Sequence, residues 1–467
     1  MPSRPPPRRR DVCPHSVDAP QVLVYLAYAG AHRARDDGRP DLYISSLSSG
    51  SFDDAPNTPT RRRRSFDALD SPTPPQRLRK FWLTRSFTAT FGTASRLRHA
   101  VYVLKLFGRL AVLTLQGSPL WVMNTFWLVM YALALAPALA RCLRYWLTGV
   151  VINVPYGPNL RHLCDVYRPS SFQKEGAPVV VFVAGGAWVI GYKAWAVPLG
   201  RALSAHGVLV VAPDYRNCPQ CAVDGMVDDV DRAVAWCLQN VHRFGGDASR
   251  LVLVGQSAGA HLCSLLLLRK LAAAGPFDDA GDADDARSFS TGGDRPWAPG
   301  DLKGFVGISG PYHVPATAAH WKARGFGQAM LDFVFGDEAG MDAASPTTVA
   351  SSLAARFGTS RGGDLPPICL LHGTADMSAP PVAAELFEAR LASLGRPAEL
   401  CLYKGWTHTD PILERPFAGD QRLHRDLLDR VRTWCGAKLP AFDAEADGLG
   451  RLCPQVMIDF GHYCMPF

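Results

Sequence analysis

The sequence predicts an α/β fold with a mainly parallel sheet. Six short apolar runs rich in β-branched residues recur between residues 179 and 405, and longer helical stretches separate them. Near-continuous apolar strands alternating with helices are typical of a parallel sheet covered on both faces, and the separations are long enough for right-handed crossovers. The runs are VVVFVAGG (179–186), VLVVAPDYR (208–216), LVLVGQS (251–257), GFVGISG (304–310), ICLLHG (368–373) and ELCLYKG (399–405).

Composition and charge argue against a wholly disordered chain and against a nucleic-acid-binding protein. The chain has 467 residues, of which 48% are hydrophobic and 19% charged, so it is not wholly disordered and can bury a large core. Residues 1–109 hold 19 Lys and Arg against nine Asp, whereas the remainder holds 30 basic and 33 acidic residues. The excess positive charge therefore belongs to the N-terminal arm, and we expect no nucleic-acid partner.

Residues 1–100 are predicted to form a disordered basic arm. They are rich in Pro, Arg, Ser and Asp, a composition that buries too little apolar surface to offset the cost of ordering.

Residues 101–145 are predicted to form a membrane segment. The stretch 110–140 carries no charged residue, and as one helix it would be about 46 Å long against a hydrocarbon core of about 30 Å. We expect a single span that starts near Pro119. A hairpin turning at 117–119 and a helix buried at the entrance to the next domain are the alternatives.

The third predicted unit is an α/β domain, residues 146–440, which is followed by a C-terminal tail over 441–467. Within the domain, residues 275–301 are acidic, rich in glycine and without periodicity, so we expect a surface insertion there. The 12 cysteines are dispersed, and Cys218 and Cys221 form one C-x-x-C without a second pair. We therefore expect free thiols and no metal site.

A candidate nucleophile follows the third apolar run. Gly255-Gln256-Ser257-Ala258-Gly259 is a G-x-S-x-G between a strand and a helical stretch. In that context the motif predicts a sharp turn that exposes the serine hydroxyl. The serine needs a base, and the base needs an acid that orients it. Asp376 follows the fifth run and His408 the sixth, which is the expected chain order for these roles. His372 competes with His408, and Asp364 and Asp410 compete with Asp376.

The loop after the first run is the candidate oxyanion hole. Gly185 and Gly186 let the backbone approach a substrate closely, and Ala258 is the first residue of the helical stretch after the serine. The backbone amides of these three residues are the candidate oxyanion donors. Ala184 stands where many esterases carry a histidine in this loop.

The chain resembles the isoprenylcysteine α-carbonyl methylesterases, which have an α/β-hydrolase fold. The similarity covers about 290 residues. The segments that carry it are AGGAWVIGYKAW (184–195), DYRNCPQ (214–220), FGGD (244–247), GQSAGAH (255–261), HGTAD (372–376) and YKGWTHTD (403–410). The resemblance implies a serine esterase without cofactor that removes the methyl ester from the C-terminal isoprenylcysteine of prenylated proteins.

Further expectations follow from that resemblance. Substrates would be prenylated proteins or prenylcysteine methyl esters, met at membrane lipid, with the enzyme on the endoplasmic reticulum or Golgi membrane. Access to such substrates favours a catalytic domain that faces the cytosol, whereas the excess of basic residues before the segment would place it in the lumen if the chain spans once. Aromatic and apolar side chains could line a prenyl groove, or could simply be core residues. These are Trp188, Trp321, Phe326, Met330, Phe333 and Phe335. A broad-specificity carboxylesterase, an arylformamidase-like hydrolase and a non-catalytic protein of the same fold are the alternatives.

Overall fold

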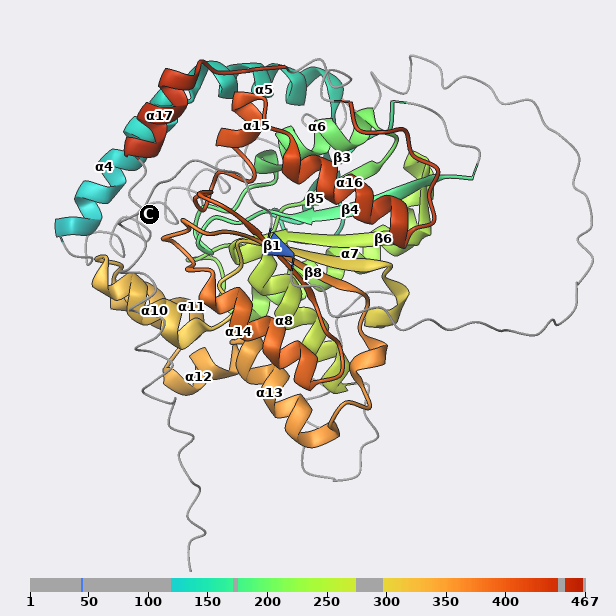
Figure 1. Ribbon diagram of the computed structural model, residues 1–467, viewed down its shortest axis with the longest axis vertical. Helices are drawn as coiled ribbons and strands as arrows, with labels where there is room; N and C mark the ends of the chain where they lie inside the picture. The colour runs from blue at the N-terminus through green and yellow to red at the C-terminus, as the bar shows by residue number, and fades with distance from the viewer. Residues whose placement is uncertain (1–42, 45–118, 171–174, 274–296, 444–449, 465–467) are drawn as a thin grey trace, which may run out of the picture.

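The computed structural model describes residues 43–44, 119–170, 175–273, 297–443 and 450–464. These residues contain a nine-stranded sheet in the order β1-β9-β8-β7-β6-β4-β5-β3-β2 (Figure 1). The strands are β1 (Tyr43–Ile44), β2 (Val151–Pro155), β3 (Leu163–Tyr167), β4 (Ala177–Val183), β5 (Leu209–Pro213), β6 (Gly246–Gln256), β7 (Gly304–Ile308), β8 (Ile368–Gly373) and β9 (Glu399–Tyr403).

The six predicted runs are strands β4 to β9, and every pairing among them is parallel. The predicted mainly parallel α/β sheet is therefore confirmed. Three antiparallel strands were not predicted: β2 and β3 at one edge and β1 at the other. Strand β2 is only half-buried, and Asp165 interrupts β3, so neither segment has the continuous apolar character of a central strand.

The two faces of the sheet pack into separate apolar cores. Side chains alternate along β4, so Val179, Val181 and Val183 face one core while Val180 and Phe182 face the other. The first core also receives side chains from α7 (Val223–Asn240), α8 (Ala258–Ala273), α13 (Pro346–Phe357) and α14 (Val382–Ser393). The second receives them from α5 (Ala136–Gly149), α6 (Val197–Ala205) and α16 (Arg422–Trp434).

Short helices occupy the connections. Between β7 and α13 lie α10 (Val314–Ala323), α11 (Gln328–Phe335) and α12 (Glu338–Ala343), and α15 (Glu414–Ala418) follows β9. The 3₁₀ turns are η1 (Lys193–Ala196), η2 (Val241–Phe244), η3 (Pro299–Asp301) and η4 (Gly362–Asp364).

The predicted membrane segment is only partly described. Residues 101–118 lie outside the described residues, and 119–149 form α4 (Pro119–Ala134) and α5. The single continuous span expected from Pro119 is not found here, because the helix breaks at Leu135, two residues before Pro137, whose ring cannot continue the hydrogen-bond ladder. Within the described ranges, no helix has the length and hydropathy needed to cross a bilayer. The first arm of the alternative hairpin lies outside the described residues.

One side of helices α4 and α5 packs on the domain, and other side chains of both helices are exposed. Tyr131, Leu135, Ala138 and Cys142 are buried in the second core. Helix α17 (Gln455–Cys464), formed by the predicted tail, lies along α4 (Figure 1). Trp127 of α4 and Tyr463 of α17 make an edge-to-face contact with ring centroids 6.0 Å apart.

Two other predicted units are described in part. Of the basic arm 1–100, only β1 is described, and it pairs with β9. Of the acidic insertion 275–301, residues up to 296 lie outside the described residues. The end of the insertion is not a free surface segment, because Trp297 is buried and its Nε1 donates to Asp231 at 2.6 Å.

Candidate active site

Ser257 sits at the sharp turn between β6 and α8. Its φ of 53° lies in the left-handed region, which non-glycine residues adopt only when their surroundings hold them there. The motif glycines make the turn possible. A Cβ on Gly259 would lie 2.1 Å from the Val183 carbonyl oxygen, and one on Gly255 would lie 2.5 Å from that of Gly259. The Ser257 amide donates to Ile308 at 2.8 Å, which ties the turn to β7.

The three side chains predicted for nucleophile, base and acid are hydrogen-bonded in series. His408 Nε2 lies 2.8 Å from Ser257 Oγ, and His408 Nδ1 lies 2.8 Å from Asp376 Oδ2. The other Asp376 oxygen accepts the amides of Ser378 and Ala379, both at 2.9 Å. All three residues follow the carboxyl ends of strands, so the parallel sheet brings them to one edge although 151 residues separate Ser257 from His408.

Asp376 is fully buried yet held as an anion. Burial by itself would raise its pKa, but the charge of His408 and hydrogen bonds from His372 and His408 outweigh burial and hold the pKa well below its usual range. Asp376 therefore stays an acceptor for an imidazole N–H throughout the neutral range.

His372, the competitor for His408, contacts the acid and not the serine. Its Nε2 lies 2.7 Å from the carbonyl oxygen of Ala379 and 3.2 Å from Asp376 Oδ2. Since a carbonyl can only accept, Nε2 carries a proton and points at both oxygens. The residue supports the conformation of the acid loop, a role that its position in the sequence did not reveal. Asp364 lies in η4, and Asp410 contacts His462 instead of His408.

The predicted oxyanion loop passes against the nucleophile. A Cβ on Gly185 would lie 2.7 Å from the Ser257 Cβ, so only glycine lets the backbone come this close. Gly186 has φ 134°, and Ala187 and Trp188 also have positive φ, which marks a tightly turned segment. Ala258 is the first residue of α8, where a backbone N–H has no acceptor within the helix.

Sequence reasoning missed the residues that hold this loop. Tyr215 Oη donates to the Ala184 carbonyl at 2.9 Å, and Asn217 Nδ2 donates to that of Gly191 at 2.7 Å. Arg161 Nη2 also donates to the Gly191 carbonyl, at 2.8 Å. Tyr215 and Asn217 belong to the DYRNCPQ segment that carried part of the resemblance, so that segment was the available signal.

Comparisons with known proteins identify the family of the chain. A family model described as BD-FAE matches residues 164–290. The chain is 34% identical over 375 residues to a probable isoprenylcysteine alpha-carbonyl methylesterase of Oryza sativa subsp. japonica, covering 79% of this chain and 86% of that protein. It is 32% identical over 351 residues to the isoprenylcysteine alpha-carbonyl methylesterase of Arabidopsis thaliana, covering 74% and 77%.

The chain belongs to the isoprenylcysteine alpha-carbonyl methylesterase family. It is a carboxylic ester hydrolase. Its fold is similar to that of esterase B from Lactobacillus Rhamnosis, with a TM-score of 0.50 at 16% identity over 67% of this chain and 96% of that one. The predicted family and the α/β-hydrolase fold are thus confirmed.

Trp188, one of the aromatic residues expected to bind substrate, is instead a core side chain in this family member. It is 2% exposed and packs edge-to-face on Trp321 and Phe335. Its Nε1 donates to His261 Nδ1 at 3.3 Å, and His261 Nε2 donates to the Ala344 carbonyl at 2.7 Å. Burial lowers the pKa of His261 to about 4, so the imidazole is neutral and anchors the oxyanion loop.

Other expected groove residues divide into two groups. Met330 and Phe335 are buried in the first core, whereas Trp321, Phe326 and Phe333 are half-buried at its margin. Trp321 Nε1 donates to the Ser378 carbonyl at 2.7 Å, which places this ring beside the loop that follows Asp376. Trp321 and Phe326 are in contact, with ring centroids 5.8 Å apart.

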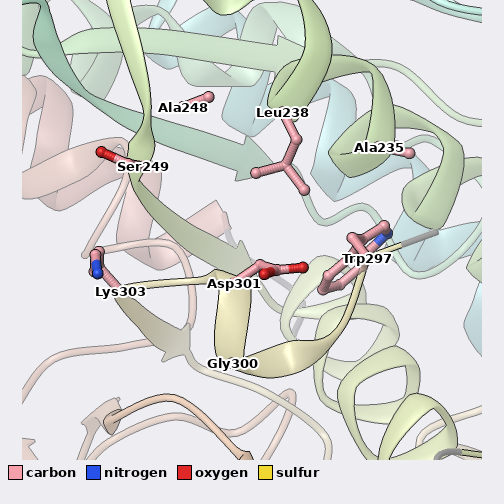
Figure 2. A pocket seen from close by; sticks show the side chains of 8 residues that line it. All are labelled: Ala235, Leu238, Ala248, Ser249, Trp297, Gly300, Asp301 and Lys303. Atoms are coloured by element: carbon pink, nitrogen blue, oxygen red, sulfur yellow. The ribbon is translucent and has the colours of Figure 1, made fainter. Parts of the chain in front are cut away.

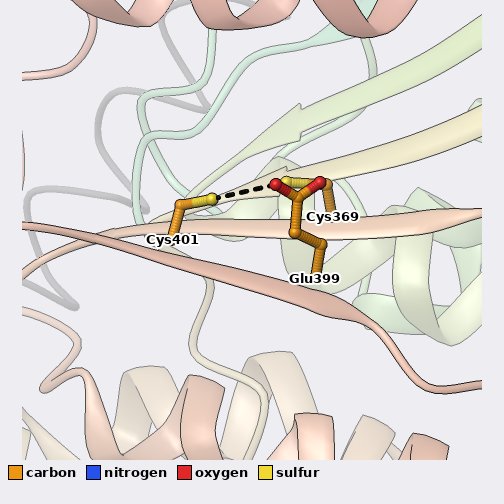
Figure 3. Close-up of side chains that lie close together, drawn as sticks. All are labelled: Cys369, Glu399 and Cys401. Atoms are coloured by element: carbon orange, nitrogen blue, oxygen red, sulfur yellow. Dashed lines mark hydrogen bonds between the residues drawn. The ribbon is translucent and has the colours of Figure 1, made fainter. Parts of the chain in front are cut away.

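One cluster of side chains resembles a metal site. Cys369, Glu399 and Cys401 lie together on β8 and β9 (Figure 3). Arg430 donates to Glu399 at 2.7 Å and to Cys401 Sγ at 3.2 Å. A guanidinium on two of the three ligands opposes a metal cation electrostatically, so we assign no metal to the cluster.

A separate pocket lies at the opposite end of the sheet. It is lined by Leu238, Ser249, Trp297 and Asp301 among others (Figure 2). Ser249 lies near the amino end of β6 and Ser257 follows its carboxyl end, so the pocket is separated from the nucleophile by the length of the strand and is not the ester-binding site.

Proposed function

We propose that the chain removes the methyl ester from C-terminal isoprenylcysteines of prenylated proteins through a Ser257–His408–Asp376 triad. The observation that carries this proposal is the continuous hydrogen-bond series through the three side chains, 2.8 Å at each step, in a member of this family.

The geometry supports an acyl-enzyme mechanism. Ser257 Oγ attacks the ester carbonyl carbon while His408 Nε2 takes the hydroxyl proton, and Asp376 stabilises the imidazolium through Nδ1. The amides of Gly185, Gly186 and Ala258 would stabilise the oxyanion. The ester C–O bond then breaks, and methanol leaves with the proton from His408. Water, deprotonated by His408, hydrolyses the acyl-enzyme to the free carboxylate. No cofactor enters this scheme.

The prenyl chain requires an apolar surface near the serine. Trp321, Phe326 and Phe333 supply half-buried rings, of which Trp321 lies beside the Asp376 loop and contacts Phe326, and they are our candidate contacts for the chain. We no longer propose Trp188 as a contact, because it is buried.

A comparison of substrates tests the proposal against a broad-specificity carboxylesterase or an arylformamidase-like hydrolase. We expect kcat/KM for farnesylcysteine methyl ester to exceed that for a short nitrophenyl ester. We also expect Trp321→Ala to reduce it for the prenyl substrate alone. Equal values for both substrates, or a Trp321→Ala effect shared by both, would favour the broader activity.

We also propose that the enzyme works at a membrane surface, on the endoplasmic reticulum or Golgi with the catalytic domain facing the cytosol, where prenylated proteins are accessible. Helices α4 and α17, which pack together, carry exposed apolar side chains. They are Met123, Phe126, Leu133, Val456, Phe460 and Tyr463. Apolar and aromatic side chains on adjacent surface helices are suited to the interface of a bilayer.

We expect the purified full-length chain to sediment with phosphatidylcholine vesicles, and the double substitution Phe126→Asp with Phe460→Asp to weaken this binding. Unchanged sedimentation of that double variant would contradict the proposed surface.

A further inference from the structure

Two buried carboxylates follow His408 in the chain. Asp410 and Glu414 are fully buried, and they lie in the segment that leads from the base into α15. A buried carboxylate is costly unless donors satisfy it, so the partners of these two residues are tightly constrained.

Asp410 joins the His408 segment to the C-terminal helix. One of its oxygens accepts the backbone amide of Thr407 at 2.7 Å and the Thr407 hydroxyl at 3.1 Å. The other accepts Arg415 Nε and His462 Nε2, both at 3.0 Å. His462 belongs to α17, 52 residues further along the chain. Thr407, the residue immediately before His408, is therefore connected through Asp410 to α17.

Glu414 makes the equivalent connection to α4. The Thr409 hydroxyl donates to Glu414 at 2.6 Å, and Tyr131 of α4 donates to the same carboxylate oxygen. Burial and then the nearby charge of Asp410 raise the pKa of Glu414. The residue immediately after His408 is thus fixed through Glu414 to the other packed helix.

We propose that Asp410 and Glu414, held by His462 and Tyr131, are positioning residues that fix the backbone on both sides of His408. This inference rests on the proposed role of His408 as the general base. Neither carboxylate touches the reacting atoms, so they act only through the placement of the imidazole. A misplacement of about 1 Å can cost on the order of 100-fold in rate, which makes such supports measurable.

The test uses two substitutions outside the segment itself, His462→Ala and Tyr131→Phe, in the full-length chain. We expect each to lower kcat for a short nitrophenyl ester about 10- to 100-fold while KM changes less than about threefold. His462→Gln retains an N–H donor and should restore part of the lost kcat. Asp459→Asn, which changes an exposed group on the same helix, is the matched control and should leave kcat unchanged.

The results distinguish this inference from the proposed function. Wild-type kcat in both folded variants, or a loss shared by kcat and thermal stability that His462→Gln does not relieve, would overturn the positioning role. If His462→Ala does not fold, Tyr131→Phe, which removes only a hydroxyl, decides the matter. Full activity of Ser257→Ala would instead refute the proposed triad, whatever the helix variants do.

Discussion

Two histidines contact Asp376, but only His408 also contacts Ser257. Sequence order and strand placement predicted Ser257, Asp376 and His408, because the chemistry requires each to follow a strand at one edge of the sheet. The hydrogen bond from His372 to the Ala379 carbonyl could not be predicted, since it depends on the path of the loop after Asp376. The burial of Trp188 was also not predicted, because the sequence does not distinguish an aromatic residue that contacts the substrate from one that anchors the glycine loop in the core.

The first prediction separates these histidines. His408→Ala should lower kcat by about 10⁴-fold or more, because the hydroxyl loses its base. His372→Ala should retain most activity and lower the free energy of unfolding by about 1–3 kcal/mol, because it removes a buried hydrogen-bond donor. Steady-state kinetics and thermal melts measure both effects. Complete loss of activity in folded His372→Ala would contradict the assignment of the base.

The second prediction concerns Gly259, the second glycine of the G-x-S-x-G motif. In Gly259→Ala the new methyl would lie 2.1 Å from the Val183 carbonyl oxygen, so the turn between β6 and α8 must shift. We expect a loss of about 2–3 kcal/mol in stability and a strong loss of activity. Gly363→Ala is the control, because no atom lies within 4 Å of its Cβ position. Urea unfolding compares the two variants, and equal stabilities would show that the turn is not tightly packed.

At the scale of elements, the strands β4 to β9 could be read from the sequence and the peripheral elements could not. Apolar runs predict buried central strands directly, whereas β2 and β3 depend on pairing with β5 for their conformation. Residues 110–140 have the composition of a membrane span. The structure places α4 and α5 against the domain, because Tyr131 and Cys142 find buried neighbours that a hydropathy pattern does not specify.

The third prediction concerns the contact between α17 and the His408 segment. The hydrogen bond to Asp410 raises the pKa of His462, against the effect of burial, and Glu414 and the opposing charge of Arg415 also face it. A raised folded-state pKa means that the stabilisation is fully present below the unfolded value of about 6.5 and is lost as pH rises through the folded value. The melting temperature of wild type should therefore exceed that of His462→Gln most near pH 6, with the difference shrinking toward pH 9. A difference that grows with pH would contradict this contact.

For the whole molecule, we propose that the folded unit begins before residue 146. The predicted domain began at residue 146, yet α4, α5 and the break between them supply Tyr131, Leu135, Ala138 and Cys142 to the second core. Full burial of a large aliphatic side chain such as Leu135 contributes about 1.5–3 kcal/mol. We therefore predict that a chain lacking residues 1–118 melts cooperatively and hydrolyses a short ester, whereas one lacking 1–145 is strongly destabilised. Equal melting temperatures for the two truncations would show that α4 and α5 are dispensable.

In the proposed mechanism His408 activates Ser257 as the nucleophile, and covalent labelling of the serine measures that activation. The full-length protein is treated with a fluorophosphonate, and the adduct is located by mass spectrometry of peptides. We predict one adduct on Ser257 in wild type, none in Ser257→Ala, and labelling slowed by several orders of magnitude in His408→Ala. Labelling at another serine, or wild-type labelling rates in folded His408→Ala, would contradict the account.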